Sequence, residues 1–548
     1  SIVNEKIGAE YSILKSLSNI IWAPIKNGIK NISLSANWMW PANNSGENAR
    51  LYSAVKSVSD YAISLGINIP TGKDSLSMTQ KYPDGTKVLS PGTVIISAAA
   101  ETSDIRKVIK PAAIKDINSE LVFINFCEGT NLSGSSFYQT LSHLGADITK
   151  TKDGEDIKKI FETIQLMIKS NKIMSGHDIS SGGFITSILE MNFPNNSHGM
   201  ELDLDNFKED DIIKILFNES PGIIIQTDND GINDLRDNKI EYVCLGKVIK
   251  ERKLKISHNS KSIELDIDYL RDVWYKTSHL LDTEQTRIEE SLSRFKNYKK
   301  QPLRFKFPNG FTGKLKNNPY KKKIKAAVIR EKGINSEREM AYMLHITGFQ
   351  VKDVHMTDLV SGRETLEDIN MIVFPGGFSN SDVLGSAKGW AGAFKFNDKA
   401  KKAIKGFYDR ENTLSLGVCN GCQLMMELNL IDKKLERNHP KMEYNNSKKF
   451  ECSFSAIDIL ESNSIMLKDL SGSTLGIWLA HGEGKFNLKN SDVDIAAKFH
   501  YGEYPGNPNG SDKSAAAISS KDGRHLAIMP HLERSVFPWN WAHYDHSR

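Results

Sequence analysis

The chain has little of what marks membrane, secreted or nucleic-acid-binding proteins. Although 39% of its 548 residues are hydrophobic, no apolar run reaches the roughly 18 residues that a membrane-spanning helix needs. Its five cysteines suit a reducing compartment, and the N-terminus lacks the basic-then-apolar layout of a secretory signal. A net charge of +4 is too small to indicate a nucleic-acid surface. These absences predict a cytoplasmic protein with neither a membrane nor a nucleic acid as partner.

One short segment has the pattern of a nucleophile elbow. Gly417-Val-Cys419-Asn-Gly421 follows the apolar, strand-like run 413–416 and precedes a helix-like stretch at 423–428. Glycines two residues before and after Cys419 allow the sharp strand-to-helix turn that presents a nucleophile at the head of a helix. A helix N-terminus or a neighbouring imidazole also favours the reactive thiolate. Cys419 is therefore the candidate nucleophile.

A candidate base and its orienting group occur together near the C-terminus. His531 and Glu533 are two residues apart just after Pro530, where an extended backbone would point both side chains the same way. The imidazole would activate the thiol, and the carboxylate would orient the imidazole, as in other activated-nucleophile triads.

The glycine pair Gly376-Gly377 follows a strand-like run at 371–373 and Pro375. Its amides, together with the Asn420 amide one residue past the nucleophile, would form an oxyanion hole. Each such donor commonly contributes about 10² to 10³ in rate. A simple turn is the alternative interpretation of Pro-Gly-Gly on its own.

The pair Cys419 and Cys422 also forms a C-x-x-C motif, which occurs in thiol redox proteins and in zinc sites. The other three cysteines are scattered, and no second C-x-x-C completes a metal cage. A thiol redox protein therefore remains the alternative from a different functional class.

The order Pro-Gly-Gly, Gly-x-Cys-x-Gly, His-x-Glu resembles a class I glutamine amidotransferase domain. Finer matches resemble the large, single-chain phosphoribosylformylglycinamidine synthases. They are Phe374-Pro-Gly-Gly-Phe-Ser, Asp382-Val-Leu-Gly, Gly417-Val-Cys-Asn-Gly-Cys-Gln, His481-Gly-Glu-Gly-Lys and Asn507-Pro-Asn-Gly-Ser. In the first half, Leu34-Ser-Ala-Asn-Trp, Thr71-Gly-Lys-Asp-Ser-Leu-Ser-Met and His177-Asp-Ile-Ser-Ser-Gly-Gly resemble the second of that family's two ATP-grasping synthase halves. The resemblance covers essentially the whole chain.

The resemblance implies ATP and Mg²⁺ in the first half. Lys73, Asp74 and Ser75 after Gly72 offer a cation, a carboxylate and a hydroxyl on an expected turn, suited to a phosphate with magnesium, although a plain polar turn fits equally. Asp178 and Ser180 offer the oxygen ligands of hard cations. The family's pattern assigns Asn19 and Asp178 to the metal and Ser180 to the nucleotide.

The family's remaining metal-binding Glu, four residues before Asn19, falls at Lys15. Three explanations stay open: a slipped alignment, a lysine that replaces the charge of the ion, or an impaired nucleotide site.

The expected fold is α/β and α+β multidomain. Residues 1–110 and 111–284 would form the two subdomains of a synthase half resembling aminoimidazole ribonucleotide synthetase. Residues 285–323, rich in Lys, Asn and Pro, would be a linker. Residues 324–548 would form a doubly wound class I glutaminase domain with the elbow at the carboxyl end of a strand.

The resemblance implies glutamine-dependent, ATP-driven amidation of formylglycinamide ribonucleotide to formylglycinamidine ribonucleotide, a ligase reaction of purine biosynthesis. The family's N-terminal synthase half precedes the matched region, and its glutaminase domain usually continues past Trp541. The chain is therefore expected to be a fragment or a split-gene subunit whose partner is the missing half, in cis or as a separate chain. A module that binds glutamine but stays idle without that half is the non-catalytic alternative.

Overall fold

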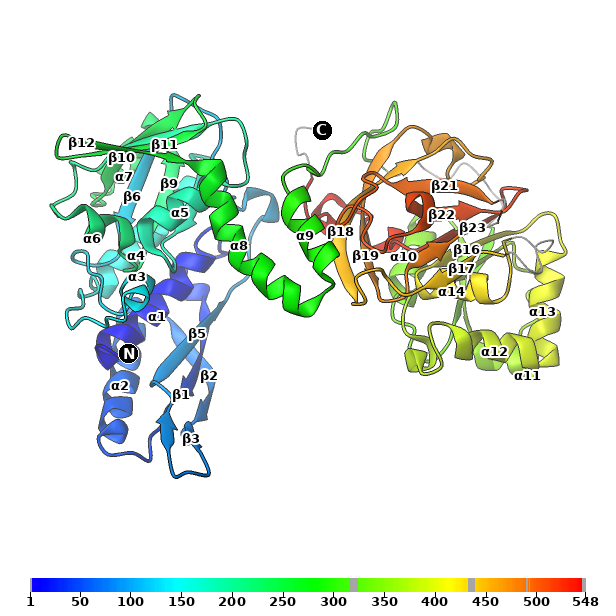
Figure 1. Cartoon of the computed structure of the whole chain (residues 1–548), viewed down its shortest axis with the longest axis horizontal. Coiled ribbons are helices and arrows are strands. Elements are labelled where there is room, and N and C mark those ends of the chain that lie inside the picture. Colours follow the sequence, from blue (N-terminus) through cyan, green and yellow to red (C-terminus); the bar gives the residue numbers. More distant parts are fainter. Residues whose placement is uncertain (1, 315–323, 432–438, 489–490, 492, 545–548) are drawn as a thin grey trace. The chain divides into compact units, whose positions relative to one another are not determined.

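The computed structural model describes residues 2–314, 324–431, 439–488, 491 and 493–544. The chain divides into two compact units, Ser1–Trp274 and Tyr275–Arg548 (Figure 1). Unit 1 contains two hydrophobic clusters and unit 2 contains one large cluster. Within the described ranges, every helix is too short or too polar to cross a membrane.

Unit 1 begins with a three-stranded sheet in the order β2-β1-β5, covered by two helices. Helix α1 starts where the Asn4 side chain accepts a hydrogen bond from the Ile7 amide at 3.0 Å, and it buries Ile13, Leu14 and Leu17 on one face. The elements are α1 (Glu5–Ile20), β1 (Ser33–Met39), α2 (Glu47–Leu65), β2 (Asn68–Ser75), β3 (Thr79–Lys81), β4 (Lys87–Leu89) and β5 (Thr93–Ala99).

The turn predicted at residues 72–75 is wrong, because this stretch is the second half of strand β2. It pairs in parallel with β1, with Asn37 opposite Lys73 and Trp38 opposite Asp74. The local glycine and polar residues indicated a turn, but the pairing with β1 lies far away in the sequence and overrides that preference.

A seven-stranded sheet, ordered β12-β11-β8-β10-β6-β9-β7, forms the rest of unit 1. In β6, Val122 and Ile124 join the cluster that contains α1 and α4, whereas Leu121 and Phe123 join the cluster that contains α5 and α6. Alternate residues of a strand face opposite sides, so a strand covered on both faces is apolar throughout. The elements are β6 (Glu120–Asn125), α3 (Ser136–Thr140), α4 (Gly154–Lys169), β7 (Ile173–Asp178), α5 (Gly183–Asn192), β8 (Gly199–Asp203), α6 (Ile212–Phe217), β9 (Gly222–Thr227), α7 (Asn229–Asp237), β10 (Val243–Ile249), β11 (Lys253–His258) and β12 (Lys261–Asp266).

Unit 2 is built on a nine-stranded mixed sheet, ordered β14-β13-β15-β16-β23-β22-β21-β18-β19 (Figure 1). The pairs from β14 to β23 are parallel and the pairs from β23 to β19 are antiparallel. The first strand of this sheet in the sequence is β13. The next strand, β14, lies on one side of it, and β15 and β16 lie on the other, so the strand order reverses at β13. Ligands of such sheets bind beyond the carboxyl ends of the strands near this reversal.

The helices and strands of this second part are α8 (Ile267–Gln285, which begins in unit 1), α9 (Ile288–Asn297), β13 (Lys325–Arg330), α10 (Glu337–Ile346), β14 (Gln350–His355), α11 (Met356–Ser361), β15 (Met371–Phe374), α12 (Lys388–Phe396), α13 (Asp398–Tyr408), β16 (Leu414–Val418), α14 (Asn420–Glu427), β17 (Lys441–Glu443), β18 (Glu451–Ile459), β19 (Thr474–His481), β20 (Lys485–Asn487), β21 (Asp494–Phe499), β22 (Ala515–Ser519) and β23 (His525–Ile528).

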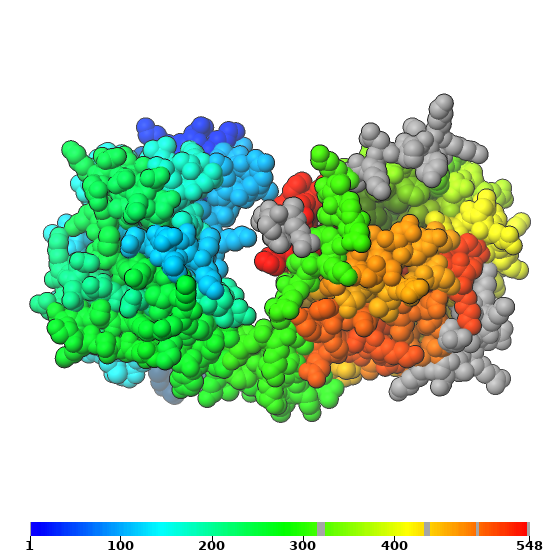
Figure 2. Space-filling model, turned by 90° about the horizontal axis from the view of Figure 1, so that it is seen from above, coloured from blue at the N-terminus to red at the C-terminus, as the bar shows by residue number. Residues whose placement is uncertain are grey.

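Part of the predicted linker 285–323 is folded against unit 2. Helix α9 lies in it, and the side chains of Ser293 and Asn297 each donate a hydrogen bond to the Tyr504 carbonyl at 2.9 Å. Lys306 forms a β-bridge with Thr474. In Figure 2 this green segment lies along the orange surface of the later strands. Residues 315–323 of the predicted linker lie outside the described residues, and the boundaries at 110 and 284 remain predictions.

Candidate active site

The predicted elbow at Cys419 is present. Cys419 lies between the end of β16 and the start of α14 with φ 51° and ψ −108°, in the region that side chains rarely adopt. A Cβ atom on Gly421 would lie 1.9 Å from the Phe374 carbonyl oxygen, and one on Gly417 would lie 2.6 Å from the Gly421 carbonyl oxygen. Both glycines are therefore required for α14 to pack so closely on β15 and β16.

The structure brings Cys419, His531 and Glu533 together. His531 follows β23, which is the parallel neighbour of β16, with Val418 opposite Ile528. His531 Nδ1 lies 2.6 Å from Glu533 Oε1, and both side chains are buried. The Cys419 sulfur acts electrostatically on this imidazole, and the thiol donates a hydrogen bond to the Ala480 carbonyl at 3.6 Å. The order is thiol, imidazole, carboxylate, as nucleophilic catalysis requires.

The predicted extended backbone at this pair is wrong beyond His531. His531 itself is extended, with φ −93° and ψ 95°, but Leu532–Arg534 forms a single turn of 3₁₀ helix. The tight turn, rather than the two-residue repeat of a strand, brings the Glu533 carboxylate back to the ring.

Electrostatics favour a charged His531. Burial alone would lower its pKa, but the negative charge of the Cys419 thiolate, its hydrogen bond to the ring and the Glu533 carboxylate together raise the pKa of His531 to about 10. The imidazole therefore carries its proton at neutral pH beside the Cys419 sulfur, which places a proton donor next to the candidate nucleophile.

The three predicted oxyanion donors differ in availability. The Gly376 amide donates to Ser336 Oγ at 2.8 Å, so it is already used. Gly377 forms a β-bridge with Ile334, in which the hydrogen bonds are made by the residues on either side of Gly377. Among the described residues, the amides of Gly377 and Asn420 make no hydrogen bond. These two amides are the pair that could donate hydrogen bonds to a developing negative oxygen.

Gly376 contributes space rather than a donor. A Cβ atom there would lie 2.6 Å from His531 Cε1 and 3.2 Å from the Cys419 Cβ atom. The backbone of this loop thus lies directly against both reactive side chains, where only glycine leaves the imidazole in place.

We expect Gly376→Ala to displace His531 and to lower the rate of Cys419 modification by a glutamine-like electrophile about 10- to 100-fold, since misplacement by about 1 Å costs about this much. Peptide mapping by mass spectrometry measures the rate. Gly406→Ala is the matched control, because a Cβ atom at Gly406 in α13 meets no neighbour within 4 Å. An unchanged rate in Gly376→Ala would contradict this arrangement.

A second buried histidine, His481, belongs to one of the family motifs, but the sequence predicted no role for it. The Asn509 side-chain amide donates to the Gly484 carbonyl at 2.7 Å and accepts from the Ser511 amide at 3.1 Å, which fixes its orientation. Its Nδ2 therefore donates to His481 Nε2 at 3.3 Å, and the ring proton is on Nδ1. Burial, and then the charge of His531, lower the pKa of His481 to about 3. This imidazole is neutral and does not compete with His531 as a base.

Ser336, which sequence reasoning missed, and the side chain of Asn420 hold the glycine loop. Ser336 lies just before α10 and accepts from Gly376, as described above. The Asn420 side chain accepts from the Ser379 amide at 3.2 Å and donates to Asp382 Oδ1 at 3.2 Å. The Asn420 side chain thus ties the start of α14 to the loop after β15. No local pattern around Ser336 indicates its role.

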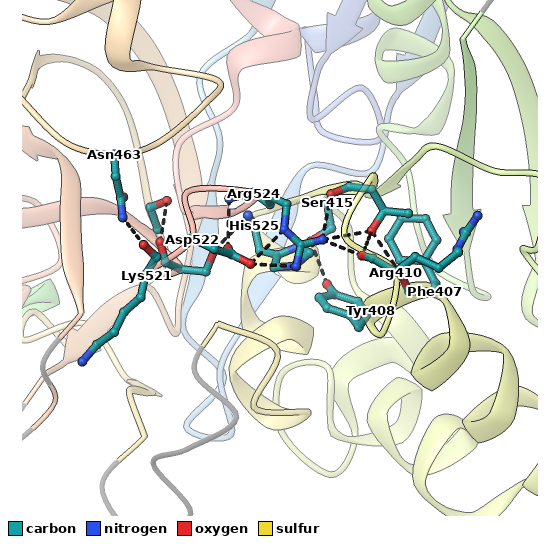
Figure 3. Close-up of polar contacts among 12 residues, drawn as sticks. Phe407, Tyr408, Arg410, Ser415, Asn463, Lys521, Asp522, Arg524 and His525 are labelled. Atoms are coloured by element: carbon teal, nitrogen blue, oxygen red, sulfur yellow. Dashed lines mark hydrogen bonds and ion pairs between the residues drawn. The ribbon is translucent and has the colours of Figure 1, made fainter.

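The amino ends of β16 and β23 are joined by a buried polar network (Figure 3). Ser415 Oγ accepts from the Tyr408 hydroxyl at 2.7 Å and lies 2.9 Å from His525 Nδ1. Arg524 donates to the Arg410 carbonyl at 2.6 Å. These contacts fix the two strands whose carboxyl ends lead to Cys419 and His531.

The residues predicted to bind the nucleotide in unit 1 are not all together. Lys73, Asp74 and Ser75 lie on the largely exposed strand β2 and line neither of the two cavities around Lys15. Ser180 lines one of these cavities, of about 520 Å³, and Asn19 lines the other. Asp178 is the last residue of β7.

The donor set near Asp178 does not fit Mg²⁺. The described residues include no group of three or more His, Cys, Asp or Glu side chains that could hold a metal ion. Lys15 instead reaches the end of β7, where its Nζ donates to the carbonyl of Ile179, the residue after Asp178, at 2.5 Å. Burial lowers the pKa of Lys15, while Asp178 and Glu219 act in the opposite direction.

Comparisons with known families agree with this architecture. Residues 323–548 match the family model of a CobB/CobQ-like glutamine amidotransferase domain. Residues 1–101 match an FGAR-AT PurM_N-like domain, and residues 125–259 match the C-terminal domain of AIR synthase related proteins. The expected α/β and α+β multidomain fold is confirmed, and unit 2 is a glutamine amidotransferase domain.

Relatives over the whole chain narrow the class to a family. A probable phosphoribosylformylglycinamidine synthase of Arabidopsis thaliana, named as chloroplastic/mitochondrial, is 35% identical over 100% of this chain and 40% of its own length. The phosphoribosylformylglycinamidine synthase of Homo sapiens is 32% identical over 99% of this chain and 43% of its own length. The chain belongs to the phosphoribosylformylglycinamidine synthase family and spans about two fifths of the length of the curated relatives it matches.

Among solved structures, PurLQS from Thermotoga maritima is similar with a TM-score of 0.33 and 27% identity, over 40% of this chain and 92% of that chain. PurL from Thermotoga maritima complexed with ATP gives a TM-score of 0.38 and 13% identity, over 50% of this chain and 42% of that chain.

Proposed function

We propose that unit 2 hydrolyses glutamine through a thioester on Cys419 and releases ammonia. The single observation that carries the proposal is the buried chain of contacts from Cys419 through His531 to Glu533, with 2.6 Å between His531 Nδ1 and Glu533 Oε1. A cysteine at a glycine-flanked elbow, with a charged imidazole beside it, suits acyl transfer from an amide.

Each step has a group on the chain. The Cys419 sulfur attacks the side-chain carbonyl carbon of glutamine, and the oxygen that becomes negative accepts hydrogen bonds from the Gly377 and Asn420 amides. The tetrahedral intermediate collapses as His531 gives its proton to the nitrogen, so ammonia leaves and a thioester remains. His531 then takes a proton from water, whose oxygen displaces the sulfur to give glutamate.

We further propose that the ammonia serves the ATP-dependent conversion of formylglycinamide ribonucleotide to formylglycinamidine ribonucleotide in purine biosynthesis. The family membership supports this reaction, and ATP would bind in unit 1 near Ser180. Because the chain spans about two fifths of its relatives' length, we propose the remaining synthase half as its partner. A cytoplasmic location stays a prediction.

The redox alternative is disfavoured by the second cysteine. Cys422 is fully buried in the core of unit 2, and this burial, followed by the negative charge of Cys419, raises its pKa well above the ordinary value. Thiol exchange needs an accessible sulfur with a low pKa. Cys422 has neither property, so its place in the C-x-x-C motif reflects packing of α14.

The test is modification by the glutamine-like electrophile 6-diazo-5-oxo-norleucine, followed by intact-mass and peptide mapping. We expect one adduct on Cys419, at least about 100-fold slower in His531→Ala because a positioned base contributes about 10² to 10⁴. His345→Ala is the matched control, since His345 lies near the end of α10 rather than at the elbow. Equal labelling of several thiols would contradict the proposal.

The idle-module alternative predicts a different result. Labelling of Cys419 would be slow in the isolated chain and would increase when the missing synthase half is added in trans. Labelling that stays absent in both conditions would contradict the catalytic proposal for unit 2.

A further inference from the structure

Lys15 places an ammonium group at the residues that were expected to bind magnesium. It lies on α1 and reaches across to the end of β7, where Nζ donates to the carbonyl of Ile179 at 2.5 Å. Ile179 directly follows Asp178, whose carboxylate is one of the two acidic side chains that raise the pKa of Lys15 against the lowering effect of burial. The other is Glu219. A positive charge is thus already present at the carboxyl end of β7.

The same side chain connects the two cavities of unit 1 that hold the predicted ligand residues. Lys15 lines the cavity of about 520 Å³ that contains Ser180, Ser181 and Glu219. It also lines the neighbouring, more open cavity of about 760 Å³ that contains Asn19. Of the residues described for these cavities, Lys15 and Tyr11 are the ones that line both.

We infer that the Lys15 ammonium takes the place of a divalent cation in unit 1, so that a nucleotide phosphate bound there is held by an ammonium group and not through Mg²⁺. The inference rests on the proposed nucleotide site of unit 1. It selects one of the three explanations that the sequence left open for Lys15.

The chemistry of the two cations supports this substitution. Magnesium requires near-octahedral oxygen coordination and is bound in proteins through one or two carboxylates together with substrate phosphates. Lysine offers three N–H donors and a point charge, which also suit phosphate oxygens. With the ammonium bonded beside Asp178, a dication at the same position would face electrostatic repulsion and would have one carboxylate fewer to bind it.

The helix geometry explains why the residue at position 15 determines whether this site can bind a divalent cation. Asn19 lies four residues after Lys15 on α1, so both side chains project from the same side of the helix. A carboxylate at position 15 would add a third oxygen ligand to those of Asn19 and Asp178, whereas the lysine adds a charge of opposite sign.

The first experiment measures binding of a fluorescent ADP analogue to the full chain with excess EDTA and with excess MgCl₂. We expect the same dissociation constant in both conditions within about threefold. We expect Lys15→Met to weaken binding at least about tenfold, which is the loss of one charged hydrogen bond. The melting temperature of each variant verifies that unit 1 is folded.

The second experiment reverses the substitution. Lys15→Glu is expected to make binding of the ADP analogue depend on Mg²⁺ by at least about tenfold and to create one Mn²⁺ site detectable by electron paramagnetic resonance. Lys6→Glu is the matched control, because Lys6 is exposed on the same helix, and it should behave like the unmodified chain. If Lys15→Glu does not fold, the comparison of EDTA with MgCl₂ and the Lys15→Met variant still test the inference.

Two outcomes would overturn the inference. One is a single tight Mn²⁺ site in the unmodified chain that is lost in Asp178→Asn, with nucleotide bound only when Mg²⁺ is present; the nucleotide site would then stand without the ammonium. The other is no nucleotide binding in either condition, which would refute the proposed site in unit 1 as well. Labelling of Cys419 is independent of both outcomes and reports on unit 2 alone.

Discussion

Replacing Cys419 by Ala is expected to abolish glutamine hydrolysis, with kcat lowered by about 10⁴- to 10⁶-fold, the loss typical when the nucleophile of a triad is removed. The reason is structural as well as chemical. Cys419 presents its sulfur at the elbow between β16 and α14 beside His531. The measurement is glutamate release followed by a coupled assay, with the synthase half supplied in trans if turnover requires it.

Cys422→Ala is the matched control for this prediction. It removes the other sulfur of the same C-x-x-C motif from a buried position, so its main effect should be on the free energy of unfolding and not on kcat. A redox protein would show the reverse, with Cys422→Ala inactive. The double variant Cys419→Ala/His531→Ala should be no worse than Cys419→Ala alone, because residues that act as a unit are not additive.

Glu533→Gln is expected to lower kcat/KM about 10²- to 10⁴-fold, although the amide keeps nearly the same shape. An amide does not stabilise the imidazolium, and it can hold the ring in the wrong tautomer, which is the basis of losses of this size in other triads. The nearby Glu483→Gln is the control, because Glu483 contacts the loop at Ser386 and not His531.

The same variant should change the pH dependence in a defined direction. In the unmodified chain His531 has a pKa of about 10, so the proton needed by the leaving ammonia stays on the ring through neutral pH and is lost as the pH rises through about 10. Without the Glu533 carboxylate the pKa of His531 falls. In Glu533→Gln the alkaline decline of kcat/KM should therefore begin at a lower pH than in the unmodified chain. An alkaline limb that does not move would show that Glu533 positions the ring without affecting its charge.

The elbow could be predicted because its determinants are local. The apolar run at 413–416 and the two glycines around Cys419 indicate strand, turn and helix within one short stretch, and the structure has them as β16, Cys419 and α14. The family membership followed from several such short segments in order.

Two of the errors share one physical cause, which is pairing with residues far away in the sequence. The stretch at 72–75 is a strand because β1 pairs with it. The Gly376 amide is used because Ser336, forty residues earlier, accepts its hydrogen bond. Glycine and serine content alone contains no information about either partner, so the sequence indicated a turn in one case and a free donor in the other.

The role of Lys15 shows a different limit. The sequence revealed that a cation stands where the family has a carboxylate, but it left open whether the site was misaligned, replaced or impaired. The contact between Lys15 Nζ and the Ile179 carbonyl makes the replacement concrete, because it places the charge beside Asp178.

Anchoring Cys419 and His531 to adjacent core strands also determines when activity is lost on heating. The Cys419 amide donates to the Ile528 carbonyl at 2.9 Å, and the network at the other end of β16 and β23 prevents the two strands from separating locally. Hydrogen exchange at Cys419 should therefore require opening of the whole sheet of unit 2, as expected for the most protected cooperative unit of a domain. Inactivation and the melting of unit 2 should consequently occur at the same temperature, without an earlier loss of active-site order.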